Sequence, residues 1–173
     1  EKLYYDCFGD YIARQIEPLP AELRVQDVVV ELAEHHDPRP LLRLVSDTLS
    51  QLSTRDWRPF NEHTIKAIPV SCLHASQPYF IQFEPEVRQK YVDLLLQRRE
   101  PFPAPHQFAF ELKYLKKQEA QRLDATVAQA REQLQGCLQM VGPGHALDLR
   151  SLADLRAWVV VFVGAVGEAA PPG

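Results

Sequence analysis

Apolar residues recur three and four positions apart through the first third of the chain. The pattern extends over residues 3–16, 25–32 and 41–52, and it is the spacing that one face of an α-helix requires. Stretches that contain proline separate these segments, and proline ends or kinks a helix because it lacks a backbone N–H. We therefore predict that residues 1–55 form a helical extension to the domain that follows.

Strand-like runs dominate the next part of the chain. A further helix is predicted to begin at Asn61, since asparagine is a favourable capping residue. Three short runs rich in apolar and aromatic residues then follow at 79–83, 90–97 and 107–115. The loop between the second and third runs is stiffened by prolines, so we expect these two strands to form a hairpin.

A long helix and a buried strand complete the pattern. Residues 116–140 carry apolar residues at helical spacing, and residues 157–163 are an uninterrupted apolar run, as in a strand buried on both faces. Because this run follows a crossover helix, it should pair parallel to an earlier strand. We predict an α/β core of order α-β-β-β-α-β with a mixed sheet over residues 56–166, and a flexible tail over residues 167–173.

Two carboxylates and an ammonium are predicted to converge on the hairpin. Glu111 and Lys113 are two positions apart in one strand, so they project from the same face, and pairing of the two strands would bring Asp93 beside them. Carboxylates are hard oxygen ligands suited to Mg²⁺, and a neighbouring lysine can orient a water or stabilise charge on a phosphate. A structural salt bridge between Asp93 and Lys113 is the alternative, because a buried carboxylate needs a partner.

Composition narrows the functional classes. The formal charge of −4, from 19 basic and 23 acidic residues, does not indicate tight non-specific binding of nucleic acid. No glycine lies between Gly9 and Gly136, which excludes a P-loop or a glycine-rich dinucleotide cradle in that stretch.

The cysteines and the lengths of the apolar runs indicate in which cellular compartment the protein is expected. The 3 cysteines contain no C-x-x-C pair, so neither a zinc knuckle nor a disulfide framework is expected, and a reduced cytoplasmic setting fits best. No apolar run is long enough for a transmembrane helix, so no membrane partner is expected. The chain begins at Glu1 rather than Met, from which we expect a fragment of a longer protein.

The order of elements, with aspartate on the second strand and Glu-x-Lys on the third, resembles the PD-(D/E)XK nuclease superfamily. The stretches that carry the resemblance are 55–62, 91–96, 108–114 and 159–164. Within that superfamily, the chain resembles the nuclease-like domain found C-terminal to AAA-type ATPase domains in many bacterial and archaeal proteins. The resemblance implies a restriction-endonuclease-like core and an ATPase domain upstream in the same chain.

The resemblance also implies roles for individual residues. Asp93 takes the place of the motif aspartate, and Glu62 matches the acidic residue of the first core helix. Gln133 could be the glutamine of a Gln-x-x-x-Tyr pattern in the following helix, but Cys137 stands where the tyrosine would fall, a departure from the family.

The activity so implied is divalent-metal-dependent hydrolysis of phosphodiester bonds, with DNA as the expected substrate. Asp93, Glu111 and the carbonyl of Leu112 would hold Mg²⁺ or Mn²⁺, and Lys113 would position the attacking water. Two alternatives remain open. The domain could be a catalytically silent module for docking or nucleic-acid sensing, or a purely structural α/β domain in which these residues do not converge.

A second cluster lies between the predicted helices of the N-terminal region. His35, His36 and Asp37 are adjacent, which suggests a metal site at first sight. Adjacent side chains in a proline-bounded turn rarely converge on one ion, so a solvated loop is the expectation.

Overall fold

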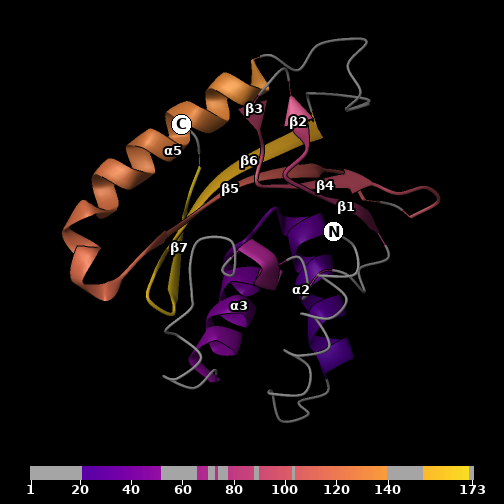
Figure 1. Ribbon diagram of the computed structural model, residues 1–173. Helices are drawn as coiled ribbons and strands as arrows, with labels where there is room; N and C mark the ends of the chain where they lie inside the picture. Colours follow the sequence, from indigo (N-terminus) through magenta and orange to yellow (C-terminus); the bar gives the residue numbers. More distant parts are fainter. Residues whose placement is uncertain are drawn as a thin grey trace.

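A central sheet with helices on both faces forms the protein in the computed structural model, which describes residues 21–51, 66–69, 73, 78–87, 90–102, 104–139 and 154–171. The strands of the main sheet lie in the order β1-β4-β5-β6-β7, and β2 and β3 form a separate two-stranded ribbon (Figure 1). The elements are α2 (Ala21–His35), α3 (Arg39–Gln51), β1 (Tyr79–Phe83), β2 (Glu86–Val87), β3 (Lys90–Tyr91), β4 (Leu94–Arg98), β5 (Gln107–Leu115), the 3-10 helix η1 (Lys117–Arg122), α5 (Leu123–Leu138), β6 (Leu155–Val163) and β7 (Val166–Ala170).

One pair of strands in the main sheet is parallel. β6 runs parallel to β5, and α5 lies between them in the chain, as the predicted crossover requires. The other pairings, β1 with β4, β4 with β5 and β6 with β7, are antiparallel. Val159, Val160, Val161 and Phe162 have no exposed surface, so the predicted interior strand is confirmed. The predicted α/β class with a mixed sheet is therefore confirmed.

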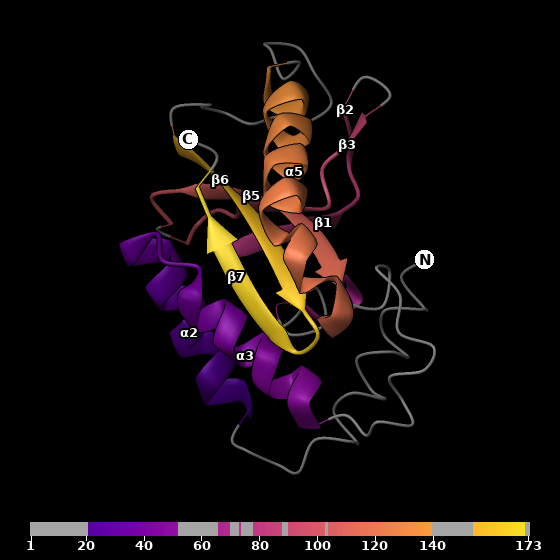
Figure 2. The ribbon, with the colours of Figure 1, turned by 90° about the vertical axis from the view of Figure 1, so that its left-hand side faces the viewer.

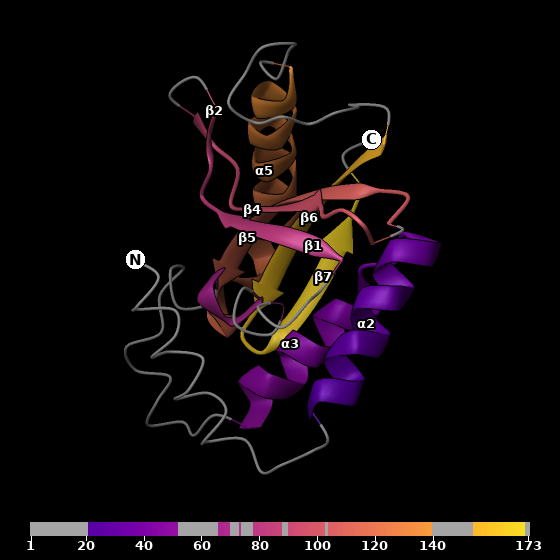
Figure 3. The ribbon, with the colours of Figure 1, turned by 90° about the vertical axis from the view of Figure 1, so that its right-hand side faces the viewer.

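Each face of the sheet has its own apolar core. Phe108, Phe110 and Leu112 of β5 pack with residues of α2 and α3, because alternate residues of a strand point to the same side. Ala109 and Leu115, which have the opposite parity, pack with α5. Figures 2 and 3 show α2 and α3 on one side of the sheet and α5 on the other. The described part of the predicted helical extension thus shares one core with the sheet.

The second predicted strand is divided in two. β3 pairs with β2 in the separate ribbon, and β4 enters the main sheet only at Leu94. Between them, the backbone N–H of Val92 donates to the Pro85 carbonyl, and that of Glu84 donates to the Asp93 carbonyl. These bonds hold a bend at Asp93 directly before the sheet begins, so the chain changes direction at a candidate site residue.

The C-terminal segment differs from the predicted flexible tail. Val166–Ala170 forms β7, an edge strand that pairs with β6 after a turn at Gly164, whose φ is +63°. A Cβ atom on Gly167 would lie 2.6 Å from the Phe162 ring, so glycine allows the strand to approach that ring closely. The strand could not be recognised in the sequence, because this segment consists mainly of small residues and prolines and has few large apolar side chains to bury.

Some predictions fall on other parts of the chain. The helix over residues 3–16 and the helix start at Asn61 lie outside the described residues. The helix predicted over residues 116–140 begins as η1 and continues as α5. Within the described ranges, no helix combines the length and the apolar character that a membrane span needs.

Candidate active site

The strand register brings Asp93 and Glu111 together. Leu94 pairs with Phe110 in the antiparallel β4–β5 ladder, so Asp93, one residue before, lies across from Glu111, one residue after. Residues opposite each other in an antiparallel pair point to the same face, and Lys113 joins them because it is two residues from Glu111. The convergence that the sequence predicted for these three residues is therefore present in the structure.

Asp93 is held in place by the backbone of β5. The N–H of Leu112 donates to Asp93 Oδ2 at 2.7 Å, and Asp93 is only 4% exposed. β4 ends its pairing at Leu94, so the carboxylate satisfies a backbone donor that has no strand partner beyond that point. In an antiparallel strand the N–H and C=O of one residue face the same neighbour, so the Leu112 carbonyl lies on the Asp93 side as well.

Glu111 is the most deeply buried member of the site. It has no exposed surface, and Lys113 Nζ lies 2.8 Å from its Oε1. The contact is an ion pair between the two side chains. Within the described part of the chain, neither carboxylate oxygen has a hydrogen-bond partner. Burial is the main cause that raises the pKa of Glu111 to about 7; the nearby Asp93 raises it further, while Lys113 and Lys66 oppose the rise.

Lys66 is a site residue that the sequence analysis missed. It lies in the helical segment 66–69 and is 8% exposed, with Nζ 2.6 Å from Asp93 Oδ1 and 3.7 Å from Glu84 Oε1. The one available signal was its spacing. Lys66 follows the candidate Glu62 by four residues in the sequence, the spacing at which residues of a helix share one face.

The remaining residues assigned from the resemblance are less central. Glu62 lies outside the described residues. Gln133 is exposed on α5, so its role in the site stays a prediction. Cys137, four residues later, is fully buried on the face of α5 that packs on the sheet, and its thiol donates to the Tyr91 carbonyl at 3.5 Å. Burial first, and then the nearby Glu111 carboxylate, raise the pKa of the Cys137 thiol.

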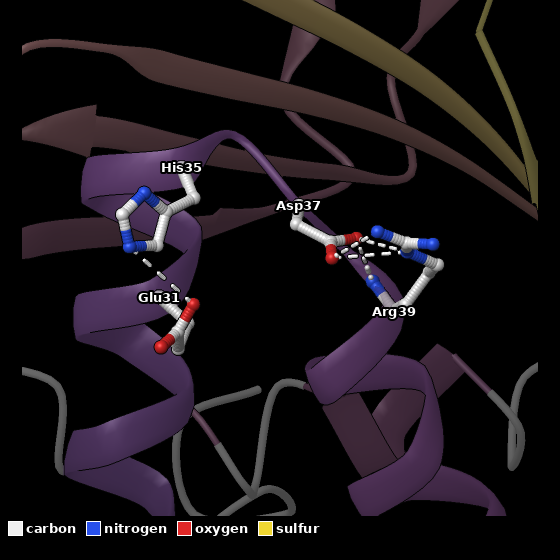
Figure 4. Close-up of polar contacts among 4 residues, drawn as sticks. All are labelled: Glu31, His35, Asp37 and Arg39. Atoms are coloured by element: carbon white, nitrogen blue, oxygen red, sulfur yellow. Dashed lines mark hydrogen bonds and ion pairs between the residues drawn. The ribbon is translucent and has the colours of Figure 1, made fainter.

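His35, at the end of α2, and Asp37, in the turn before α3, make separate contacts (Figure 4). His35 Nε2 lies 3.8 Å from Glu31 Oε2 on its own helix, whereas Asp37 accepts bonds from the backbone N–H and the side chain of Arg39. The Arg39 side chain lowers the pKa of Asp37. The His36 ring instead meets that of His106, the residue directly before β5, at 3.7 Å between centroids. These contacts support the predicted loop rather than a metal cluster.

The donor set suits a hard cation. Asp93 and Glu111 supply carboxylate oxygens, those of Glu111 lack hydrogen bonds within the described residues, and the Leu112 carbonyl lies on the same side. Mg²⁺ commonly uses one or two protein carboxylates and completes its shell with water and substrate. Across the described ranges, no three histidine, cysteine or acidic side chains gather closely enough to form a full protein cage. The residues therefore fit a sparse, hydrated metal site.

A mixed sheet flanked by helices, with Asp93 at the start of one strand and Glu-x-Lys on the next, defines a restriction-endonuclease-like domain. The chain belongs to the PD-(D/E)XK nuclease superfamily, whose family model matches residues 60–166. No curated protein matches the chain. Membership of this superfamily points to nuclease-type hydrolysis of phosphodiester bonds and to nucleic acid as the partner, and its nucleases typically use divalent metals.

Proposed function

We propose that this domain hydrolyses phosphodiester bonds of DNA with Mg²⁺ or Mn²⁺ as cofactor. The observation that carries the proposal is the buried Glu111 carboxylate, which lacks hydrogen bonds within the described residues and lies across the strands from Asp93. Burial of a charged carboxylate lowers the stability of the fold unless an opposite charge lies close to it. A bound cation would offset this loss of stability.

The metal would be held by Asp93, Glu111 and the carbonyl of Leu112, with Glu62 and Gln133 as further members implied by the family. When bound, it would polarise the scissile phosphate and lower the pKa of a coordinated water. The bond from the Leu112 N–H fixes the Asp93 carboxylate, so this ligand is oriented before any ion arrives.

Lys113 is the residue proposed to act on the reacting groups. Its side chain is 20% exposed and its ammonium lies beside Glu111. The ammonium therefore contacts the buried carboxylate while part of the side chain is accessible to solvent. From this position it would orient the attacking water and stabilise the charge that develops on the phosphate. We expect its loss to lower turnover more than metal affinity.

A partly open surface continues the site toward β1. Phe80 and Gln97 are paired across β1 and β4, on the same face as Glu111, whereas α5 packs over β5 and β6. Phe80 is 54% exposed, and the Arg99 guanidinium lies 5.1 Å from its ring centroid. An exposed aromatic ring beside a cation is a suitable platform for a nucleic-acid base and its phosphate. The net charge of −4 limits general attraction to DNA, so such local contacts matter more.

A catalytically silent module is the second candidate, and one observation favours it. Lys66 contacts Asp93 and Lys113 contacts Glu111, so each carboxylate already has a cationic neighbour. A site balanced in this way could persist for structural reasons alone. With either function we also propose an upstream ATPase domain, which the family resemblance supports, and a cytoplasmic location, which the cysteine pattern supports.

The two functions are separated by measuring Mn²⁺ binding and plasmid nicking on the same preparations. We expect the native chain to nick supercoiled DNA in the presence of Mn²⁺, and we expect excess EDTA to stop this nicking. Glu111→Gln, which keeps the side-chain shape, should lose both binding and nicking, whereas Glu119→Gln in η1 should retain both. Nicking that continues in EDTA, or that survives Glu111→Gln, contradicts the metal mechanism. Mn²⁺ binding without cleavage of any DNA favours the silent module.

A further inference from the structure

Lys66 forms an ion pair with Asp93, one of the carboxylates proposed to bind the metal. Its ammonium lies 2.6 Å from Asp93 Oδ1, while the Leu112 N–H takes Oδ2. Lysine is among the residues least often buried, and its burial is tolerated when an opposite charge lies close. The cation beside Asp93 is therefore a side chain of the same chain.

A divalent ion and the Lys66 ammonium cannot both lie against Asp93 without a penalty. Two cations that share one carboxylate are within a few ångströms of each other, and their repulsion is strong where little water screens it. The lysine must therefore withdraw when the metal binds, and the cost of withdrawal reduces the apparent metal affinity.

Glu84 provides a place for the withdrawn ammonium. Its Oε1 is already 3.7 Å from Lys66 Nζ, and its side chain is 33% exposed. The Glu84 backbone has a φ of 47° and its N–H donates to the Asp93 carbonyl at 3.0 Å, so the turn holds Glu84 next to the site. A small movement of Nζ from Asp93 toward Glu84 would exchange one ion pair for another.

We propose that Lys66 is an internal competitor for the metal: it is bound to Asp93 in the metal-free protein and transfers to Glu84 when the ion enters. The inference rests on the metal site of the proposed function. It makes Lys66 a positioning residue that sets how much free metal the site requires, and it makes Glu84 the residue that lowers this requirement.

The test is calorimetric titration of the full chain with Mn²⁺. Lys66→Met removes the competing charge and should tighten Mn²⁺ binding on the order of tenfold, the scale expected for one close charge in a partly buried site. Lys90→Met is the matched control, because Lys90 is exposed near α5, where its Nζ lies 3.0 Å from a Cβ built on Gly136. We expect less than a twofold change for the control.

Glu84→Gln adds a second readout that a purely structural lysine would not affect. It should weaken Mn²⁺ binding in the native background, because the withdrawn ammonium loses its second partner. The same substitution should have a much smaller effect when Lys66 is already methionine. These four proteins form a double-mutant cycle. If Lys66→Met folds poorly, Lys66→Gln takes its place in the cycle, and the effect of Glu84→Gln is measured with and without it.

The outcomes are distinct. Equal or weaker Mn²⁺ binding by a folded Lys66→Met protein overturns the inference and leaves the proposed function in place. An effect of Glu84→Gln that is the same with and without Lys66 also overturns it. If neither the native chain nor the lysine variants bind Mn²⁺, both the inference and the proposed metal site are wrong.

Discussion

The backbone N–H of Leu112 donates to the Asp93 carboxylate at 2.7 Å, so a side chain of one strand completes the hydrogen bonding of the next. The contact lies where β4 stops pairing with β5. It ties the candidate metal ligand to the strand that carries Glu111 and Lys113. The same carboxylate meets Lys66 on its other oxygen, and both contacts are buried.

Substitution of Asp93 should therefore affect stability as well as cleavage. Asp93→Asn removes the negative charge that lies 2.6 Å from the buried Lys66 ammonium, and loss of one partner of a buried ion pair costs roughly 3 kcal/mol or more. We expect Asp93→Asn to be destabilised in urea unfolding at neutral pH. The double variant Asp93→Asn, Lys66→Met should recover most of the loss because the buried lysine charge is removed together with its carboxylate partner, yet it should not cleave DNA. Equal stability of the single and double variants would contradict the buried pair.

The buried Glu111 should make stability depend on pH. Its pKa is raised from 4.5 to about 7, so the native state keeps a proton that the unfolded state releases between these values. The contribution of Glu111 to stability is therefore full below pH 4.5, falls as the pH rises toward 7, and is absent above it. Relative to the native chain, Glu111→Gln should gain stability with rising pH, on the order of 3 kcal/mol at pH 8. Urea unfolding from pH 5 to 8 measures the difference, and a difference independent of pH would contradict the raised pKa.

The strands and the convergent residues could be predicted because they depend on local periodicity. The two-residue spacing of Glu111 and Lys113 fixes their common face, and the proline-rich loop fixes the hairpin that places Asp93 opposite. The apolar run at Val159–Phe162 likewise indicates an interior strand. In each case the signal is contained in a short stretch of sequence.

Lys66, the bend at Asp93 and β7 could not be predicted in the same way. The contact between Lys66 and Asp93 joins residues far apart in the chain, and a lysine on a helix is ordinarily a solvated residue. The division of the second strand depends on backbone bonds from Val92 and Glu84, which leave no pattern in the side chains. β7 is held by its pairing with β6 and by close approach at Gly167, so composition alone suggested a tail.

The departure from the family pattern at Cys137 leads to a further prediction. The thiol is fully buried between α5 and the sheet, so a larger tyrosine side chain would have to displace the side chains packed around it. Cys137→Tyr should therefore destabilise the fold by roughly 1–3 kcal/mol through overpacking. Gln133→Ala, one turn earlier on an exposed position, is the control and should change stability by less than about 0.5 kcal/mol. Thermal unfolding of both variants is the measurement, and a stable Cys137→Tyr protein would show that this part of the core can rearrange.

The exposed ring on β1 gives a prediction about substrate contact that does not depend on cleavage. If Phe80 stacks on an unpaired base beside the Arg99 guanidinium, Phe80→Ala should weaken binding of a short labelled single-stranded oligonucleotide by roughly tenfold, within the range of one base-stacking contact. Fluorescence anisotropy in EDTA at fixed low salt measures the affinity without turnover. Val166→Ala is the matched control, because Val166 is an exposed apolar residue on β7 at the opposite edge of the sheet. Since Phe80 is 54% exposed, its truncation should leave the thermal midpoint nearly unchanged. Equal losses of affinity in the two variants, or none in either, would mean that the β1 surface is not part of the nucleic-acid path.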